Sequence, residues 1–244
     1  MSFILFMRNS NSWKLMEEDF LNHCFIEVKN KVEATDKNSP SQRNLFKQGF
    51  SFSGLSRSEQ LMIWDYIWNN SSEFWLSMQS FLFLEKNMKN KDFLTLSWDT
   101  IKKWQNKVDH WGKCDGLSKI YTKVLEIIPD QVLQQLKQWN KSDNLWDRRQ
   151  SLVSLLYFSR TKKIILPYET IIPFVAELID DKEYYVQKGI GWTLKELYGV
   201  YPNKTLKYIE KNAKRISTTA FSAAAEKLEK SDKERLKKMR KPAR

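Results

Sequence analysis

The chain has 244 residues and a formal net charge of +12, from 41 lysines and arginines against 29 aspartates and glutamates, so we expect an anionic partner. Its two cysteines, Cys24 and Cys114, exclude a disulfide framework and are typical of a reducing cytosol. No apolar run approaches the ~18 residues that a membrane span needs, and the apolar patch near the N-terminus is too short for a signal peptide, so we expect a cytoplasmic protein with no membrane partner.

Apolar residues at helical spacing recur along most of the chain and predict an all-α protein. In the first half they predict helices over residues 12–32, 57–69, 72–85 and 100–108. Ser56 and Glu59 form a capping-box pattern before the second of these helices, and Ser71 is the expected cap of the third. Residues 33–43 are mostly polar, hold Pro40 and predict a loop.

The second half continues the same alternation of helices and short connections. Helices are expected on both sides of Pro129 and then over residues 145–160, 167–179, 183–197, 202–213 and 217–228. Helix pairs of about 35–45 residues predict a HEAT-like helical repeat solenoid, a single domain over residues 1–229 with a concave basic groove. Residues 230–244 are basic and have few apolar side chains, so we expect a flexible tail.

The helix over residues 183–197 carries an unusual face. Its apolar stripe is ordinary core, but Lys188, Gly191, Trp192 and Lys195 lie away from that stripe, with Tyr185 at the edge. A glycine inside a helix costs about 0.5–1 kcal/mol and is tolerated where another group must come close. Two interpretations stay open: a neighbouring helix packs on Gly191 and Trp192, or Lys188 and Trp192 meet a phosphate-bearing ligand.

Trp111 and Asp115 form a second such pair, because residues four apart in a helix lie on one face. They point away from the apolar stripe of their own helix. The competing interpretation places Asp115 at the helix N-terminus, as a cap or a first-turn carboxylate, where aspartate is common.

Arg149 lies among the apolar positions of its helix, whereas Arg148 lies at the margin, closer to water. A buried guanidinium needs an anion with hydrogen-bond acceptors. That anion is either a buried carboxylate of the protein or a phosphate, which the planar donors of arginine bind in a bidentate manner.

These segments resemble elements of AlkD-like bacterial DNA alkylation repair proteins. Residues 144–149, NLWDRR, are similar to the family's Asn-x-Trp-x-x-Arg segment, and residues 183–192 to its aromatic-x-x-Lys-x-Ile-Gly-Trp helix. Trp111 and Asp115 match a Trp-x-x-x-Asp element, and residues 50–55, FSFSGL, match a Phe-x-Phe-x-Gly segment. The resemblance covers about residues 45–228.

The resemblance implies a HEAT-like glycosylase that removes N3- or N7-alkylated purines from double-stranded DNA, working as a monomer without a metal or other cofactor. It makes Asp115 the catalytic carboxylate, places Trp111 and Trp192 against the deoxyribose, and has Arg149 grip a backbone phosphate; Lys188 is a further candidate DNA contact. Two departures concern Leu45, where several members have a tyrosine, and residues 217–222, which lack the paired arginines of many members.

Other chemistries have less support. The chain contains no GxxxxGK[ST] or GxGxxG phosphate loop, and two histidines with two cysteines are too few for an ordinary zinc site. The alternative function is a non-catalytic HEAT-like scaffold that binds nucleic acid or a protein. Asp115 distinguishes the glycosylase from the scaffold, because a carboxylate that faces DNA repels phosphate and is useful mainly in catalysis.

Overall fold

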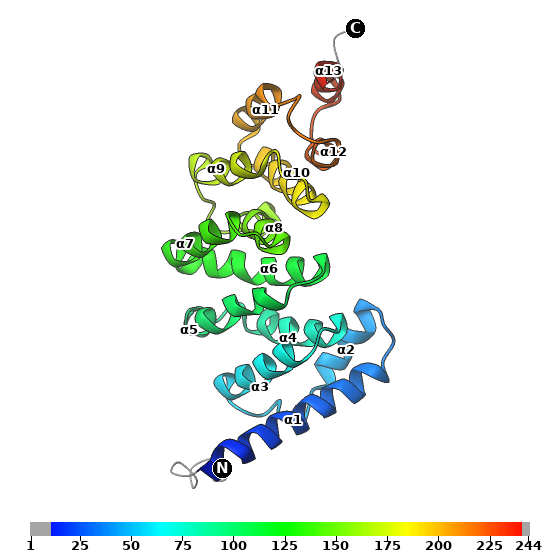
Figure 1. Ribbon diagram of the computed structural model, residues 1–244, viewed down its shortest axis with the longest axis vertical. Helices are drawn as coiled ribbons and strands as arrows, with labels where there is room; N and C mark the ends of the chain where they lie inside the picture. The colour runs from blue at the N-terminus through cyan, green and yellow to red at the C-terminus, as the bar shows by residue number, and fades with distance from the viewer. Residues whose placement is uncertain (1–10, 241–244) are drawn as a thin grey trace. The chain divides into compact units, whose positions relative to one another are not determined.

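The computed structural model describes residues 11–240, with side chains from residue 18 onward. Over that range the chain is helical, with thirteen α-helices, two short 3-10 helices and no strand (Figure 1). None of these helices is long and apolar enough to cross a membrane. The chain divides into two compact units, one ending at Lys107 and the other starting at Val108, where the sequence predicts a single domain over residues 1–229.

The first unit is built on a cluster of aromatic side chains. Its elements are α1 (Asn11–Glu33), α2 (Ser39–Gln48), α3 (Arg57–Asn70), α4 (Phe74–Asn87), α5 (Lys91–Ile101) and the 3-10 helix η1 (Lys102–Lys107). The Trp64 indole meets the rings of Phe50 and Phe52 edge-on at 5.4 and 5.2 Å, and Trp68 stacks on Trp104 at 4.9 Å. Aromatic pairs in these geometries stabilise a core beyond their buried area.

Helix boundaries in this unit confirm some predictions and correct others. The capping box of Ser56 and Glu59 is present at the start of α3. Ser71 instead follows the end of α3, and Glu73 is the residue that precedes α4. The loop predicted over residues 33–43 is wrong from Ser39 onward, because Pro40 lies in the first turn of α2, where a missing N–H loses no hydrogen bond.

Two further features of the first unit concern an expected helix and the place of Leu45. The helix expected over residues 100–108 is replaced by the end of α5 and the 3-10 helix η1. Leu45 is only 5% exposed, so it is a core residue of this unit.

The second unit carries the remaining helices. They are α6 (Trp111–Ile127), α7 (Pro129–Asn140), α8 (Leu145–Val153), the 3-10 helix η2 (Ser159–Thr161), α9 (Tyr168–Leu178), α10 (Tyr184–Tyr198), α11 (Pro202–Lys211), α12 (Thr218–Ala224) and α13 (Lys230–Arg240). Helices α6, α8, α10 and α12 pack as successive neighbours in one row (Figure 1). Each of α7, α9 and α11 packs against the helix of that row that precedes it. This succession of helix pairs is the arrangement predicted from the sequence.

Helix α8 is shorter than predicted. The expected helix ran to residue 160, but α8 ends at Val153. Leu155 and Leu156, which continue the apolar pattern, are fully buried although they lie beyond the helix. The chain then passes through Phe158, whose φ of 48° is left-handed and incompatible with a continuing helix.

The C-terminal segment also differs from the prediction. Residues 230–240, expected to be a flexible tail, form α13, whose Leu236 is completely buried. The Arg240 guanidinium donates hydrogen bonds of 2.6 Å to the carbonyl oxygens of Ala213 and Ile216 and lies over the Phe221 ring. Arg235 also forms an ion pair with Glu210 of α11, so one apolar side chain and two arginines dock a helix whose composition is otherwise typical of a solvated segment.

We expect deletion of residues 230–244 to lower the melting temperature by roughly 5–10 °C. Burying a leucine side chain stabilises a protein by about 1.5–3 kcal/mol, and each kcal/mol corresponds to roughly 2–4 °C for a domain of this size. Differential scanning calorimetry measures the shift. Leu236→Ala should reproduce most of it, whereas Lys237→Gln with Lys238→Gln should leave it within about 1 °C; an unchanged melting temperature after the deletion contradicts docking of α13.

Candidate functional site

Helix α6 positions Trp111 and Asp115 on one face. The helix begins at Trp111, and its N-cap is His110, whose Nδ1 accepts a hydrogen bond from the Gly112 N–H at 3.1 Å. Asp115 therefore lies beyond the first turn and is not the cap, so the interpretation of its carboxylate as a helix-end group is wrong. The Trp111 side chain is 48% exposed, and the Asp115 side chain is 26% exposed.

Helix α8 positions Arg149, which is only 6% exposed. The helix starts after Asn144, whose side chain accepts from the Trp146 N–H at 2.8 Å. Arg149 Nη2 donates to Asp115 Oδ1 at 2.8 Å, and Nη1 donates to the Tyr185 carbonyl oxygen at 2.9 Å. Of the two anions left open by the sequence, the structure shows a carboxylate of the protein, and that carboxylate is Asp115.

The electrostatics of this pair keep the guanidinium charged. Burial works to lower the pKa of Arg149, but the neighbouring Cys114 and Asp115 side chains outweigh burial and raise it above the usual value. The third nitrogen, Arg149 Nε, is buried and makes no hydrogen bond to any part of the chain that the structure describes. Arg149 thus holds Asp115 by one Nη and is itself held by the backbone of α10.

Arg148 lies on the other side of α8 and has a structural role. Its Nε donates to Asp181 Oδ2 at 2.6 Å, and its Nη1 donates to the carbonyl oxygens of Ser142 and Asp143. The Arg148 side chain is 16% exposed and the Arg149 side chain 8%. The two adjacent arginines therefore differ mainly in their partners, which are Asp181 for Arg148 and Asp115 for Arg149.

Helix α10 supplies Trp192, whose indole is surrounded on several sides. The Lys195 ammonium lies 4.1 Å from the ring centroid, in cation–π geometry. The Tyr157 ring stacks on the indole at 6.0 Å, and the Phe158 ring meets it edge-on at 5.1 Å. Trp192 Nε1 is buried without a hydrogen-bond partner in residues 11–240.

Gly191 is explained by helix packing. A Cβ at this position would lie 2.4 Å from the Ala220 carbonyl oxygen and 2.8 Å from the Ala223 Cβ, both on α12. Only glycine permits this approach of the two helices. The neighbouring-helix interpretation is therefore correct for Gly191, whereas Trp192 both packs and faces a pocket.

A pocket of about 400 Å³ brings the candidate residues together. It is lined by Trp111, Asp115, Arg149, Tyr184, Tyr185, Lys188, Trp192, Lys195, Ala223 and Glu226. All five residues singled out from the sequence are in this set, because they lie on α6, α8 and α10, which neighbour one another in a single row. Lys195 and Tyr185, which the sequence places on the same face of α10 as Trp192 or at its edge, also line the pocket, whereas Tyr184 and Glu226 were not predicted.

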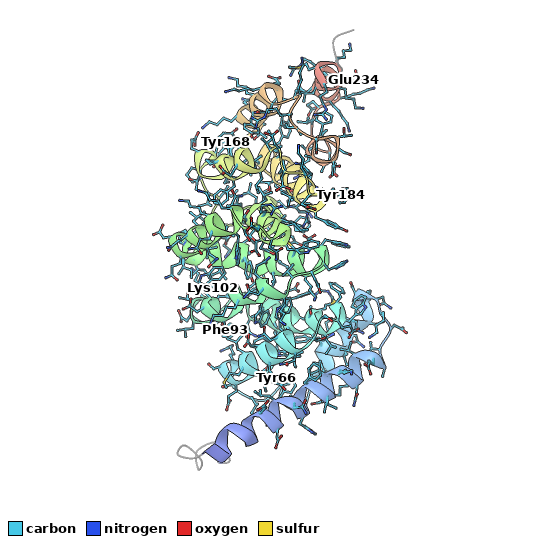
Figure 2. All side chains as sticks on the ribbon, in the orientation of Figure 1. Tyr66, Phe93, Lys102, Tyr168, Tyr184 and Glu234 are labelled. Carbon is cyan, nitrogen blue, oxygen red and sulfur yellow. The ribbon has the colours of Figure 1, made fainter. Side chains whose placement is uncertain are left out.

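These lining residues differ in how far the sequence points to them. Tyr184 is 57% exposed at the start of α10, where Figure 2 labels it. Lys195 follows Trp192 by about one helical turn, and its predicted place beside the indole is confirmed. Glu226 follows α12, and only the close packing of α12 on Gly191 brings it to the pocket.

The charges of the pocket are mostly paired. Asp115 is paired with Arg149, and Glu226 accepts from Lys195 Nζ at 2.9 Å. Lys188 is exposed and makes no ion pair within the described part of the chain. The mouth of the pocket therefore has one cation available for an anionic ligand. No three His, Cys, Asp or Glu side chains of the described residues are grouped so that they could hold a metal ion.

Residues 217–222, which lack the expected arginines, begin α12. The Ser217 side chain accepts from the Ala220 N–H at 3.0 Å and donates to Gln187 Oε1 at 2.6 Å. This segment therefore caps α12 and joins it to α10.

Comparison with known proteins gives one family and one fold. A family model described as DNA alkylation repair enzyme matches residues 28–228. The chain is similar to the crystal structure of AlkD2 from Streptococcus mutans, with 17% sequence identity, a TM-score of 0.57, and coverage of 87% of this chain and 99% of that chain. The crystal structure of smu.31 from Streptococcus mutans UA159 matches with 19% identity and a TM-score of 0.46, over 88% of this chain and 97% of that chain. No curated protein sequence matches. The likeness to AlkD2, together with the helix pairs, confirms the all-α, HEAT-like fold.

Proposed function

This chain belongs to the family of DNA alkylation repair enzymes, and on that premise we propose that it is a DNA glycosylase that hydrolyses the N-glycosidic bond of N3- or N7-alkylated purines in duplex DNA. The observation that carries the proposal is the Asp115 carboxylate. It is partly exposed, is held by Arg149, and lines a pocket together with the indoles of Trp111 and Trp192.

The chemistry needs one carboxylate. An alkylated purine carries a positive charge, so it leaves with the bonding electron pair and needs no general acid. The sugar then has oxocarbenium character, as in glycoside hydrolysis. Asp115 stabilises that charge and orients a water, whose oxygen bonds to C1′ while its proton passes to the carboxylate or to solvent. The products are the free alkylpurine and an abasic site.

The indoles of Trp111 and Trp192 support the same step. The face of an indole attracts a cation, and the sugar becomes cationic only near the transition state. Lys188, exposed at the pocket, contacts a backbone phosphate and contributes affinity that falls as salt is raised.

For Arg149 we propose a different role from the one that the family resemblance implies. A grip on phosphate requires exposed N–H donors, but Arg149 is only 6% exposed, and each Nη already donates one hydrogen bond within the protein, to Asp115 or to the Tyr185 carbonyl. We therefore assign Arg149 to holding the Asp115 carboxylate in place. This role is that of a positioning residue, because the guanidinium acts on the sugar only through Asp115.

The enzyme is proposed to be monofunctional, metal-independent and active as a monomer that binds double-stranded DNA. A cationic leaving group removes the need for a lysine nucleophile, so strand cleavage is not part of the reaction.

Base release from methylated duplex DNA tests the proposal. Purified protein, incubated in excess EDTA, should release 7-methylguanine or 3-methyladenine above the spontaneous rate, measured by chromatography of the free base. Borohydride should trap no covalent protein–DNA adduct. Loss of release that zinc or magnesium restores contradicts metal independence, and a trapped adduct contradicts the monofunctional mechanism.

The alternative is a non-catalytic HEAT-like scaffold that binds nucleic acid or a protein. It is favoured by one observation, that the Asp115–Arg149 pair joins α6 to α8 and so has structural value without catalysis. Tight binding of methylated duplex DNA with no base release by the wild-type protein would select this alternative.

A further inference from the structure

The segment that follows α8, residues 157–163, contains a strained residue beside the candidate site. Phe158 has φ 48° and ψ 75°, and it is the one non-glycine residue with positive φ between residues 11 and 240. A bulky side chain rarely adopts this conformation. Such strain persists only where the surrounding structure enforces it, and it gathers at functional sites. We call residues 157–163 the strap.

The strap lies against Trp192. Phe158 meets the indole edge-on at 5.1 Å, and Tyr157 stacks on it at 6.0 Å. The indole N–H is buried without a hydrogen-bond partner in the described residues, and a native structure rarely leaves such a donor unpaired. The strained backbone of Phe158 and the unpaired N–H of Trp192 thus belong to side chains in contact, which indicates that the surrounding structure imposes the position of this indole.

One end of the strap is anchored to α10 by a buried carboxylate. Glu196 is 2% exposed, and its Oε2 accepts from the Ser159 N–H at 2.8 Å and from the Ser159 hydroxyl at 2.6 Å. Its Oε1 accepts from Lys227 Nζ at 3.0 Å. Burial works to raise the pKa of Glu196, but the hydrogen bonds from Ser159 and Lys227 outweigh burial and lower it, so the carboxylate is charged at neutral pH. Glu196 follows Trp192 by four residues, so both lie on one face of α10.

The other end of the strap is anchored to α6. The fully buried Lys162 side chain donates to Thr122 Oγ1 at 2.8 Å, and Lys123 donates to the Thr161 carbonyl at 3.1 Å. The Lys163 N–H donates to Glu126 Oε1 at 3.2 Å. The strap therefore ties the helix that carries Trp111 and Asp115 to the helix that carries Trp192.

We propose that Glu196, acting through Ser159, is a positioning residue that locks the strap and thereby fixes the Trp192 indole at the pocket. The expected effect on the rate of base release rests on the proposed glycosylase function. The expected effect on the position of the Trp192 indole does not. Glu196 touches no substrate. Its carboxylate sets the path of the strap backbone, the strap places the Phe158 and Tyr157 rings, and these rings place Trp192.

The test compares Ser159→Ala and Glu196→Gln with Asp181→Asn. The control also neutralises a buried carboxylate of the second unit, but the hydrogen-bond donors to the Asp181 carboxylate, Arg148 and the Glu183 N–H, lie outside the strap. Protein is labelled with 5-fluorotryptophan, and the Trp192 resonance is assigned through Trp192→Phe. We expect this resonance to shift or broaden in Ser159→Ala and Glu196→Gln and to stay in place in Asp181→Asn.

Single-turnover base release adds a second readout. Because a misplacement of about 1 Å can cost about 10²-fold in rate, we expect a fall of about 10-fold at saturating DNA in both strap variants, with half-saturation unchanged within about 2-fold. A Trp192 resonance unmoved in both strap variants, or moved equally in Asp181→Asn, overturns the proposal. Ser159→Ala keeps its backbone donor, so it decides the matter if Glu196→Gln fails to fold. A wild-type protein that releases no base refutes the glycosylase, while the resonance still decides the strap.

Discussion

Asp115→Asn should slow single-turnover release of 7-methylguanine or 3-methyladenine by about 10²–10³-fold, or roughly 3–4 kcal/mol of transition-state stabilisation. The substitution keeps the size of the side chain and its hydrogen-bonding capacity but removes the charge. That charge matters when the sugar becomes cationic and has little effect in the ground state. Affinity for undamaged duplex, measured by fluorescence anisotropy, should be unchanged or slightly higher, because a negative charge near the phosphates has gone.

The stability of this variant should be measured beside its rate. The amide oxygen of the substituted side chain can still accept from Arg149, but the buried guanidinium loses its counter-charge, so we expect a loss of about 1–2 kcal/mol in the free energy of unfolding. Rates compared well below the melting temperature separate this loss from catalysis. Wild-type release rates in a folded variant would remove the catalytic role of Asp115.

Arg149→Met should have the largest effect on stability among single substitutions at the site, about 3 kcal/mol or roughly 6–12 °C in melting temperature. It removes the ion pair with Asp115 and the hydrogen bond to the Tyr185 carbonyl while keeping most of the buried side-chain volume. The rate of base release should also fall in this variant, because the Asp115 carboxylate is no longer held in a fixed position relative to the sugar.

Arg148→Met is the matched control for this prediction. It removes an ion pair of similar length from the neighbouring residue, so the melting temperature should fall, but base release per folded molecule should persist. Equal damage to release by Arg148→Met, with folding intact, contradicts the assignment. Because Asp115 and Arg149 are in direct contact, their double variant should be less unstable than the sum of the two single losses.

Much of the site followed from local periodicity. The spacing of Trp111 and Asp115 placed both on one face of a helix, and the apolar stripes showed which faces point away from the core. Helix pairing then explains why Arg149 and Trp192 join them, since the three helices are neighbours in one row. The partner of Arg149 could not be derived, because a buried cation accepts any well-placed anion and the sequence does not say which helix supplies it.

The errors in the fold have local physical causes. Residues 39–43 are polar, but Gln42 is fully buried and its amide donates to three backbone carbonyls, so polarity did not signal a loop. The apolar pattern continued past Val153 because Leu155 and Leu156 stay buried after the helix has ended. The basic composition of residues 230–240 concealed one buried leucine, Leu236, and two arginines, Arg235 and Arg240, that bind the preceding segments of the unit.

The position of Arg149 also determines how the second unit comes apart. Helical repeats are stabilised mainly by their nearest neighbours, so such a stack can lose terminal repeats one at a time. The Arg149 guanidinium reaches from α8 to Asp115 on α6 and to the Tyr185 carbonyl on α10, and it therefore bridges two interfaces at once. Loss of either neighbour leaves a buried charge or a buried donor unsatisfied, which makes the two interfaces cooperative. The pocket accordingly has no half-assembled form: it is complete or absent, and its loss on heating should coincide with the unfolding of α6, α8 and α10 together.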